Sequence, residues 1–403
     1  MHGEDALEYF MKLNRITLQI AGIWPVDKNE LLATFRFFAM TSYLFIAVIL
    51  LQSIQLIIVW GDIDAMSDIL LIGLLLMFVT LVKMISLWYY KQKMKTILNS
   101  IILDWDNVET KEDYKIMTEY ANFSKKISDT YIFVALATSV TRFMQISYIN
   151  RDAWFRSDRN LTRIFVMNAY FPFDYNYFPV FELTYFFDHL AAFMANICNC
   201  GVDGLFFQIG FHYLAQFRIL HLKLTNIATT TNSHLTLYVN FDRRLSQIVR
   251  KHEHINRCLG LLEDTFCILL LVQLISHTFL FCLQGYQFIS NLTQENSKLI
   301  LMDLFFMVGY VTYMLGNSYI YCYVSEKLQN SSLMLGESAY DSKWFNLMPE
   351  KSRNFLLIIQ RARKPVKFTA AKIASMNMQK FGSILKTSMG YLSLLLTMMN
   401  RHK

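Results

Sequence analysis

Residues 37–61 read FFAMTSYLFIAVILLQSIQLIIVWG and contain no charged side chain over 25 positions. A helix needs about 20 predominantly apolar residues to cross the hydrocarbon core of a bilayer. Residues 265–294 and 304–325 form two further uncharged stretches, of 30 and 22 residues. Because helices of soluble proteins seldom remain uncharged over such lengths, the chain is predicted to be a polytopic membrane protein.

Four more segments have the length of a span but contain charge. Residues 69–90, 130–150 and 189–217 each hold one ionisable side chain, namely Lys83, Arg142 and Asp203. Such a residue costs about 2.5–3.5 kcal/mol at mid-helix on insertion scales, which a dozen apolar neighbours can offset. Residues 368–400 hold three lysines, so this segment is either a surface helix or a helix that faces water inside the membrane. The prediction is an all-α fold with seven transmembrane helices.

The composition excludes several other classes. With 54% hydrophobic and 17% charged residues, the chain is far from soluble usage. Cys198 and Cys200 are two positions apart in a predicted helix and share no face, so neither a zinc site nor a disulfide is expected. No phosphate loop, nucleophile motif or basic nucleic-acid module is present, so we expect no enzyme, no cofactor and no nucleic-acid partner. The first residues lack a basic start before an apolar core, so no cleavable signal peptide is expected.

Basic residues indicate the orientation of the chain. With the N-terminus in the cytoplasm, 26 Lys and Arg residues lie on the inner side and 7 on the outer side. Since cytoplasmic loops collect basic residues, this ratio favours a cytoplasmic N-terminus and an extracellular C-terminus. The glycosylation sequons at Asn160 and Asn291 fall on the predicted outer face, although Asn122 and Asn330 match the same pattern on the inner face.

Two inner segments are predicted to be amphipathic helices. Apolar residues recur at helical spacing from Leu245 onward, so the fifth span is expected to continue as a helix below the membrane. A second helix is expected from Lys351 to Arg363. Their apolar stripes require burial against the same subunit or a neighbour, which points to a helical cytoplasmic layer that anchors subunits. The aromatic outer segment 151–182 could fold down as a lid or pack on the rim, and the sequence leaves both open.

Two groups of residues resemble the insect odorant receptor family. Gly22-Ile23-Trp24-Pro25 looks like the signature that these receptors carry before their first span. A stronger match runs from Ser325 to Met399 and covers about a fifth of the chain. It includes Ala339-Tyr340, Ser342, Trp344-Phe345, Leu356-Leu357-Ile358-Ile359-Gln360-Arg361, Lys364-Pro365, Phe368-Thr369-Ala370, Phe381, Ile384-Leu385-Lys386 and Tyr391. Gly390-Tyr391 and Thr397-Met398 depart from the ending of the related gustatory receptors, which favours the odorant branch.

The resemblance implies an odorant-tuned subunit in the plasma membrane of olfactory sensory neurons. Such a subunit joins a shared coreceptor in a heterotetramer, binds a small volatile ligand and gates a non-selective cation pore. It implies a division of the chain into an N-terminal segment (1–36), spans one to six with the ligand pocket (37–325), a cytoplasmic anchor (326–367) and a pore-lining last helix (368–400). The residues expected in the subunit anchor are Tyr340, Trp344, Phe355 and Ile359.

The last helix carries a stripe of residues spaced by three or four, polar below and apolar near the outer end. A water-filled vestibule that leads to a narrow gate requires this order, although the stripe could also be a polar seam between packed helices. The vestibule candidates are Asn377, Lys380, Ser383 and Thr387, and the gate candidates are Tyr391, Leu394, Thr397 and Met398. Four copies of Lys380 and Lys386 around one axis would repel cations, so we expect poor conduction by a homotetramer.

By resemblance, the outer halves of spans two, three, four and six enclose the ligand. Aromatic and methionine side chains adapt to small apolar molecules, while a few polar groups fix orientation. The candidates are Met77, Phe143, Met144, Ser147, Tyr185, His189, Phe193, Phe306, Tyr310 and Tyr313. His189, beside Asp188, is also explained as a structural histidine with its hydrogen bonds satisfied.

Two other functions fit seven apolar helices less well. A G-protein-coupled receptor would have an extracellular N-terminus, an Asp-Arg-Tyr-like triplet after the third span and a proline in the last span, and the sequence has none of these features. A secondary transporter would show repeats or interrupted helices around buried charges. Arg142, Asp203 and Asp303 are charges of that kind, but no repeat accompanies them.

Overall fold

A computed structural model describes residues 2–154, 161, 163–227, 236–292 and 297–402. It is almost entirely helical. The elements are α1 (Gly3–Phe10), α2 (Lys12–Ile20), α3 (Glu30–Leu44), η1 (Phe45–Leu50), α4 (Leu51–Ile58), α5 (Ile63–Ile69), η2 (Leu70–Leu74), α6 (Leu75–Tyr89), α7 (Lys91–Asp106), α8 (Lys111–Ile149), η3 (Asn150–Asp152), α9 (Val180–Thr225), α10 (Thr236–Leu292), α11 (Ser297–Asp341), η4 (Trp344–Asn346), α12 (Pro349–Ala362), β1 (Thr369–Ala370), β2 (Ala374–Ser375) and α13 (Met378–His402).

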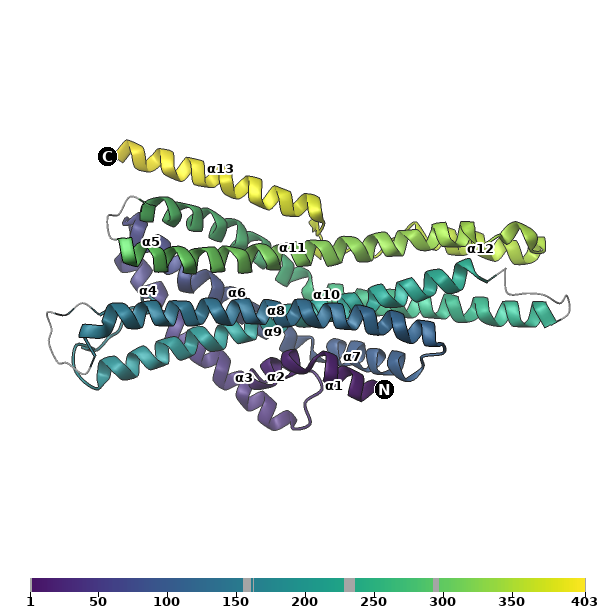
Figure 1. Cartoon of the computed structure of the whole chain (residues 1–403), viewed down its shortest axis with the longest axis horizontal. Helices are drawn as coiled ribbons and strands as arrows, with labels where there is room; N and C mark the ends of the chain where they lie inside the picture. Colours follow the sequence, from purple (N-terminus) through teal and green to yellow (C-terminus); the bar gives the residue numbers. More distant parts are fainter. Residues whose placement is uncertain (1, 155–160, 162, 228–235, 293–296, 403) are drawn as a thin grey trace.

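Within these residues there are seven helical spans, of which α8, α9, α10 and α11 run along the long axis of the molecule, whereas α3–η1–α4 crosses it obliquely (Figure 1). The first two spans are the continuous runs α3–η1–α4 and α5–η2–α6, and the others are α8, α9, α10, α11 and α13. Five of the seven are long and apolar enough to cross a membrane by length and composition.

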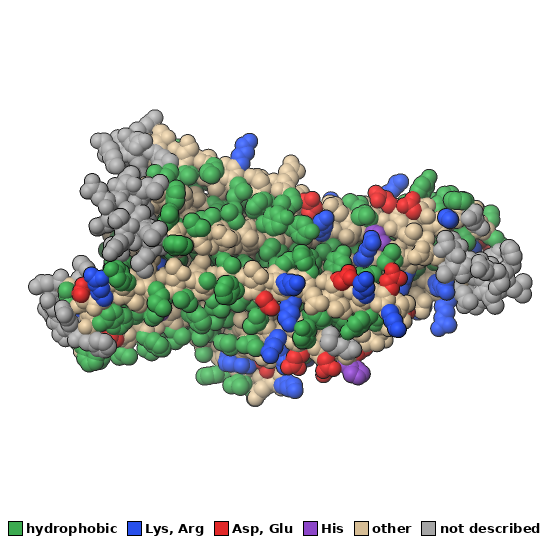
Figure 2. Space-filling view, in the orientation of Figure 1, with side chains coloured by type: hydrophobic (Ala, Val, Ile, Leu, Met, Phe, Trp, Pro, Cys, Tyr) green, Lys and Arg blue, Asp and Glu red, His purple; other side chains and the backbone are tan. Residues whose placement is uncertain are grey.

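The polypeptide alternates between the two ends of the bundle. The α4–α5 turn, the segment that leads into α9 and the C-terminal end of α13 lie at one end, while the α7–α8 turn and α12 lie at the other (Figure 1). On the face shown in Figure 2, charged side chains gather toward the half that contains α7 and α12, and hydrophobic side chains cover the half around α4 and α5. The structure thus separates a polar half from an apolar half along the direction of its helices.

α9 is the central helix of the bundle. Its residues are buried almost without interruption from Ala195 to Leu220, and α2, α6, α8 and α11 pack around it. A helix that is apolar on all sides has to be enclosed by other helices or by lipid. Here other helices enclose it, so side chains from α9 contact several neighbouring helices at once.

Local sequence signals set several helix ends. The Asn29 side chain accepts a hydrogen bond from Leu32 N at 3.1 Å at the start of α3, and Thr110 accepts one from Asp113 N at 3.0 Å at the start of α8. Such caps satisfy backbone donors that the first turn leaves free. Pro349 occupies the first turn of α12, where its missing N–H costs nothing.

The motif before the first span forms a tight turn. Gly22 has a φ of 72°, and a Cβ atom there would lie 2.2 Å from the carbonyl oxygen of Ala33. Only glycine fits a left-handed conformation against a backbone at this distance. Ile23 and Trp24 are buried beside it, so the motif fixes the N-terminal helices against the start of α3.

The last helix begins later than predicted. Instead of a helix from 368, residues 369–375 form a small antiparallel hairpin in which Ala371 and Lys372 have positive φ values of 50° and 61°. The hairpin is held in place because Ala371 N donates to the carbonyl oxygen of Cys267 at 2.8 Å. α13 then starts at Met378, whose N–H donates to Glu326 Oε2 at 2.7 Å. Lys372 therefore lies outside the last helix.

The polar half of the bundle contains the amphipathic helices that the sequence predicted. α10 extends as one helix over 57 residues, and α12 spans Pro349–Ala362. Phe355 is buried against its own chain, with its ring 6.2 Å from that of Phe241. Of the two alternatives that the sequence left open, Phe355 adopts burial against the same chain, and its part in the subunit anchor stays a prediction. Leu356 and Leu357, on the opposite side of α12, are 63% and 65% exposed.

A charged pair lies buried at the centre of the bundle. Lys83 Nζ of α6 lies 2.5 Å from Asp203 Oδ1 of α9, and both side chains are at most 1% exposed. The sequence indicated both charges but not that they pair. Buried charges require a partner and further hydrogen bonds.

Neighbouring side chains complete the hydrogen bonds of this pair. Asn199 Oδ1 accepts from Lys83 Nζ at 2.6 Å. Asp203 accepts from the hydroxyl groups of Tyr131 at 3.0 Å and Tyr321 at 2.6 Å, and from Asn317 Nδ2 at 2.5 Å. The network thereby joins α6, α8, α9 and α11, which is a structural role for the charges rather than a transport pathway.

Candidate functional site: a cavity among α5–η2–α6, α8, α9 and α11

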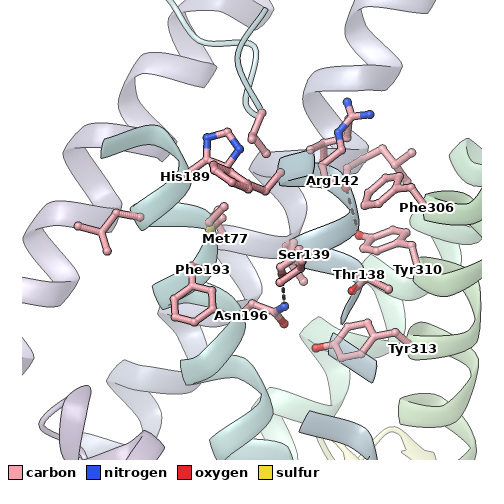
Figure 3. A pocket seen from close by; sticks show the side chains of 18 of the residues that line it. Met77, Thr138, Ser139, Arg142, His189, Phe193, Asn196, Phe306, Tyr310 and Tyr313 are labelled. Atoms are coloured by element: carbon pink, nitrogen blue, oxygen red, sulfur yellow. Dashed lines mark hydrogen bonds between the residues drawn. The ribbon is translucent and has the colours of Figure 1, made fainter. Parts of the chain in front are cut away.

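A cavity of about 380 Å³ lies between four of the spans. Its wall is mostly apolar and aromatic, with a few polar side chains. The lining residues are Leu71, Ile72, Leu76, Met77, Thr138, Ser139, Val140, Arg142, Phe143, Val166, Phe186, His189, Leu190, Ala192, Phe193, Asn196, Phe306, Tyr310 and Tyr313. Pockets for small organic molecules have this character, with volumes of roughly 300–1,000 Å³. Figure 3 shows the polar side chains on its wall.

Seven of the ten predicted ligand residues share this cavity. Met77 comes from the second span, Phe143 from α8, His189 and Phe193 from α9, and Phe306, Tyr310 and Tyr313 from α11. The structure brings together side chains that are up to 236 positions apart in the sequence, from Met77 to Tyr313.

Three predicted ligand residues do not line the cavity. Met144 is 59% exposed, because it follows Phe143 by one position and so points about 100° away around α8. Ser147 Oγ and the Tyr185 hydroxyl bond each other at 2.7 Å. Tyr185 also packs against Trp154, with ring centroids 5.0 Å apart. Their polar groups are thus used in joining α8 to α9.

Most polar groups of the wall are already hydrogen-bonded within the protein. Asn196 Nδ2 donates to Ser139 Oγ at 2.7 Å, and the Tyr310 hydroxyl donates to the carbonyl oxygen of Leu71 at 3.1 Å. Leu71 belongs to η2, where the helix widens into a π-helical turn. The Tyr313 hydroxyl accepts from Asn199 Nδ2 at 2.6 Å and so connects the floor of the cavity to the buried charged pair.

His189 and Arg142 differ from these residues. The Nε2 atom of His189 and the Nε atom of Arg142 are buried and have no hydrogen-bond partner among the described residues. The expectation of a satisfied structural His189 is therefore wrong for one of its two nitrogens. Asp188 does not serve as its partner, since Asp188 Oδ2 accepts from Val166 N at 2.8 Å and Met167 N at 3.3 Å.

The outer segment before α9 contributes to the site. Phe165, Val166 and Met167 are buried, and Val166 reaches the cavity wall. The two backbone bonds to Asp188 hold this part of the segment against α9. Whether segment 151–182 acts as a lid or packs on the rim stays a prediction.

Three aromatic residues of the wall are also open to the outside of the bundle. Phe143, Phe186 and Phe193 are 41%, 59% and 38% exposed. They come from α8 and α9, and their exposed edges would face lipid in a membrane. An apolar molecule could therefore reach the cavity sideways from the bilayer.

The predicted pore residues lie on one long face of α13. Ser383, Thr387, Tyr391, Leu394 and Thr397 are exposed. Asn377 caps the helix by accepting from Lys380 N at 2.8 Å. The Met398 side chain lies outside the described residues.

The same helix borders a second cleft against α10. Lys380, Ser383, Thr387 and Tyr391 line this cleft, whose volume is about 230 Å³. Tyr391 stacks on Phe279 of α10 with ring centroids 6.1 Å apart. Beside this stripe on α13, Ser388 is buried, and its Oγ donates to the carbonyl oxygen of Thr278 at 3.0 Å. α13 therefore has a face attached to α10 and a polar face that is uncovered in this single chain.

The remaining predicted sites are placed as follows. Tyr340 is 66% exposed at the end of α11, and Trp344 and Ile359 are partly buried. Asn160 and the side chain of Asn291 lie outside the described residues, so nothing is said of the two outer sequons.

Several cavity residues were missed from the sequence. Arg142 and Asn196 are polar residues within apolar spans, and this isolation is the signal that would have identified them. Thr138 and Ser139 carry no such signal, because hydroxyl groups are common in membrane helices. Val166 belongs to an irregular segment, and its position depends on the bond to Asp188.

Comparison with known proteins identifies relatives of the chain. A family model described as 7tm Odorant receptor matches residues 70–389. Odorant receptor 13a of Drosophila melanogaster is 26% identical over 232 residues, which is 53% of each chain. Odorant receptor 10a of the same species is 22% identical over 400 residues, 94% of this chain and 93% of that protein. The Drosophila odorant receptor coreceptor is 25% identical over 147 residues, 36% of this chain and 29% of the coreceptor.

A solved structure has the same fold. The insect olfactory receptor OR5 from Machilis hrabei, determined in complex with eugenol, superposes with a TM-score of 0.80 at 17% sequence identity. The superposition covers 97% of this chain and 98% of the receptor.

Proposed function

Because this chain belongs to the 7tm Odorant receptor family, we propose that it is an odorant-tuned receptor subunit. In this proposal it binds a small, mostly apolar volatile molecule in the cavity and gates a non-selective cation pore together with a coreceptor subunit. The family consists of receptors rather than enzymes. The proposed location is the plasma membrane of olfactory sensory neurons, with the N-terminus inside.

The cavity is the observation that carries the proposal. It is apolar, it has the size of a volatile molecule, and it lies in the half of the bundle that is covered by hydrophobic side chains. Its floor is connected through Tyr313 and Asn199 to the network that holds α6, α8, α9 and α11 together. A ligand that changes the packing of these helices would therefore act on the core of the bundle.

The position of α13 supports the pore part of the proposal. It lies at the edge of the bundle (Figure 1), and its polar stripe borders an open cleft beside α10 in which Ser383 and Thr387 remain exposed. Polar residues on a membrane helix need water or a neighbouring subunit. A pore formed by the last helices of several subunits would supply both.

The cytoplasmic anchor is proposed to join subunits through its exposed residues. The exposed apolar residues at this end include Tyr340, Phe345, Leu356 and Leu357. Exposed patches of this kind are typical of protein interfaces. The basic residues of the same half, together with the count from the sequence, support a cytoplasmic position.

The experiment that tests the proposal is co-expression of the chain with an odorant coreceptor in a heterologous cell. Currents are recorded during application of a panel of volatile compounds. We expect at least one compound to evoke a cation current that is absent from cells with the coreceptor alone. A chain that reaches the surface with the coreceptor but adds no response to any compound would contradict the proposal. Accessibility of an N-terminal epitope in intact cells would contradict the orientation.

A further inference from the structure

Two buried nitrogen atoms border the cavity without a hydrogen-bond partner in the described part of the chain: His189 Nε2 and Arg142 Nε. Buried polar groups in folded proteins are nearly always hydrogen-bonded. The other polar groups of the wall follow this rule, as the pairs Asn196–Ser139 and Tyr310–Leu71 show. A ligand in the cavity is therefore the natural partner of the two remaining atoms.

The surroundings of His189 fix which of its nitrogens carries hydrogen. Nδ1 lies 3.0 Å from the carbonyl oxygen of Tyr185, which can only accept a hydrogen bond, so Nδ1 is the donor. The ring packs between aromatic neighbours, with the Phe143 centroid at 4.7 Å and the Tyr185 centroid at 4.2 Å. Within the described residues no carboxylate lies at ion-pair distance. A second proton would place an uncompensated cation in this apolar wall, so the ring is neutral and Nε2 is a hydrogen-bond acceptor.

Arg142 presents the opposite chemistry. Its NH1 group donates to Gln145 Oε1 at 2.9 Å and lies 3.6 Å from Asp303 Oδ1. The guanidinium also stacks over the ring of Phe306 at 5.0 Å. Its charge is thus already balanced by Asp303, and an anionic ligand would gain little from it. The N–H at Nε remains a donor.

In Figure 3, His189 and Arg142 lie at the same end of the cavity, above Met77 and Ser139. An acceptor and a donor therefore border one end of a mostly apolar chamber. A hydroxyl group matches both, because its hydrogen can be donated to one atom while its oxygen accepts from another. A carbonyl or ether oxygen can only accept, and would leave His189 Nε2 buried and unpaired.

Building on the proposed receptor function, we infer that this cavity selects alcohols and phenols. The ligand hydroxyl donates to His189 Nε2, its oxygen is available to Arg142 Nε, and its hydrocarbon part fills the aromatic chamber. Esters, ketones, ethers and hydrocarbons of the same shape are discriminated against. At a packing density of ~0.75, the cavity of about 380 Å³ holds a molecule of at most about 285 Å³, which admits an alcohol of about ten carbon atoms.

The inference is tested with matched ligands. The probes are 4-phenylbutan-1-ol, 4-butylphenol and citronellol, each compared with its methyl ether and with the hydrocarbon that lacks the oxygen. Currents are recorded from the chain with its coreceptor. Binding to the purified chain is measured separately as a shift in thermal unfolding. We expect the best alcohol or phenol to act at a concentration roughly five- to thirtyfold below that of its methyl ether, the factor for one unpaired buried hydrogen-bonding group.

Variants assign the preference to His189. His189→Phe keeps an aromatic ring against Phe143 but removes the acceptor, so the ratio between alcohol and ether should fall to about one. His189→Gln retains an acceptor and should keep part of the preference. Thr184→Val is the matched control, because Thr184 lies on the same helix and its hydroxyl donates to the carbonyl oxygen of Val180 at 2.8 Å. This control should leave the ratio unchanged.

The outcomes separate this inference from the proposed function. Alcohols, ethers and hydrocarbons of equal potency in the unmodified receptor would overturn the inference and leave the receptor function intact. If the His189→Phe variant still prefers the alcohol over its ether, the inference is likewise overturned and the receptor function is left intact. Selective binding of alcohols to the purified chain without any current would support the inference and contradict the gating function. Failure of every alcohol and phenol to shift unfolding of the purified chain would overturn the inference.

Discussion

Replacement of Lys83 by Met would leave the Asp203 carboxylate buried without a cation. At an effective dielectric constant of about 20, two charges 2.5 Å apart attract by ~7 kcal/mol. The net loss is smaller, because the variant no longer has to desolvate the Lys83 ammonium. The Asp203 carboxylate also keeps its hydrogen bonds from Tyr131, Tyr321 and Asn317. The expected destabilisation is about 3–5 kcal/mol, the range for removal of one partner of a buried pair.

Asp203→Asn should be equally harmful, since it leaves the Lys83 ammonium buried without an anion. In the double variant Lys83→Met/Asp203→Asn, neither charge remains, and the carbonyl oxygen of the new amide at position 203 still accepts hydrogen bonds. Each single variant leaves one buried charge without a partner, whereas the double variant leaves none. We therefore expect the double variant to be more stable than either single variant.

The assay is the midpoint of thermal unfolding of detergent-solubilised protein, followed by fluorescence-detected size exclusion, together with surface labelling in cells. The expected order of midpoints is parent, double variant, then the two single variants. The reasoning would be refuted by a single variant with the parent midpoint, or by a double variant that is less stable than both single variants.

Three further predictions concern the ligand, the pore and the anchor. Phe143→Ala and Tyr310→Ala should change the potency of active ligands several-fold without loss of surface expression, as dose–response curves would reveal; unchanged potency in both would contradict the position of the ligand. The chain expressed without coreceptor should give little cation current, because Lys386 would be repeated around the pore axis, and robust currents in whole-cell recordings would disprove this. Leu356→Glu and Leu357→Glu should reduce co-precipitation with the coreceptor and leave thermal unfolding of the isolated chain unchanged, since both side chains are exposed; full co-precipitation would exclude this surface as the anchor.

The sequence alone was sufficient to predict that the spans and the amphipathic helices between them are helical. A run such as 37–61 must be a membrane helix because the hydrocarbon core accepts no unpaired backbone group, whatever the rest of the chain does. The amphipathic helices at 245–262 and 351–363 were likewise predicted, because the spacing of apolar residues along one segment determines its amphipathic face; the structure places the second at Pro349–Ala362. Motifs near the N-terminus and in the last quarter of the chain were enough to identify the family resemblance.

Tertiary structure decided the rest. The hairpin at 369–375 interrupts a segment that looks helical, because its backbone bonds to Cys267, about 100 positions earlier. In the sequence, Lys83 and Asp203 are single charged residues in two different apolar spans. Their pairing depends on how α6 packs on α9. The acceptor at His189 likewise results from one carbonyl oxygen in its own helix and from the absence of an acid in contact among the residues described. Hydropathy and residue spacing show that a segment needs an apolar environment or a polar partner. The side chain that provides this partner comes from a distant segment, so it is known only once the helices are packed.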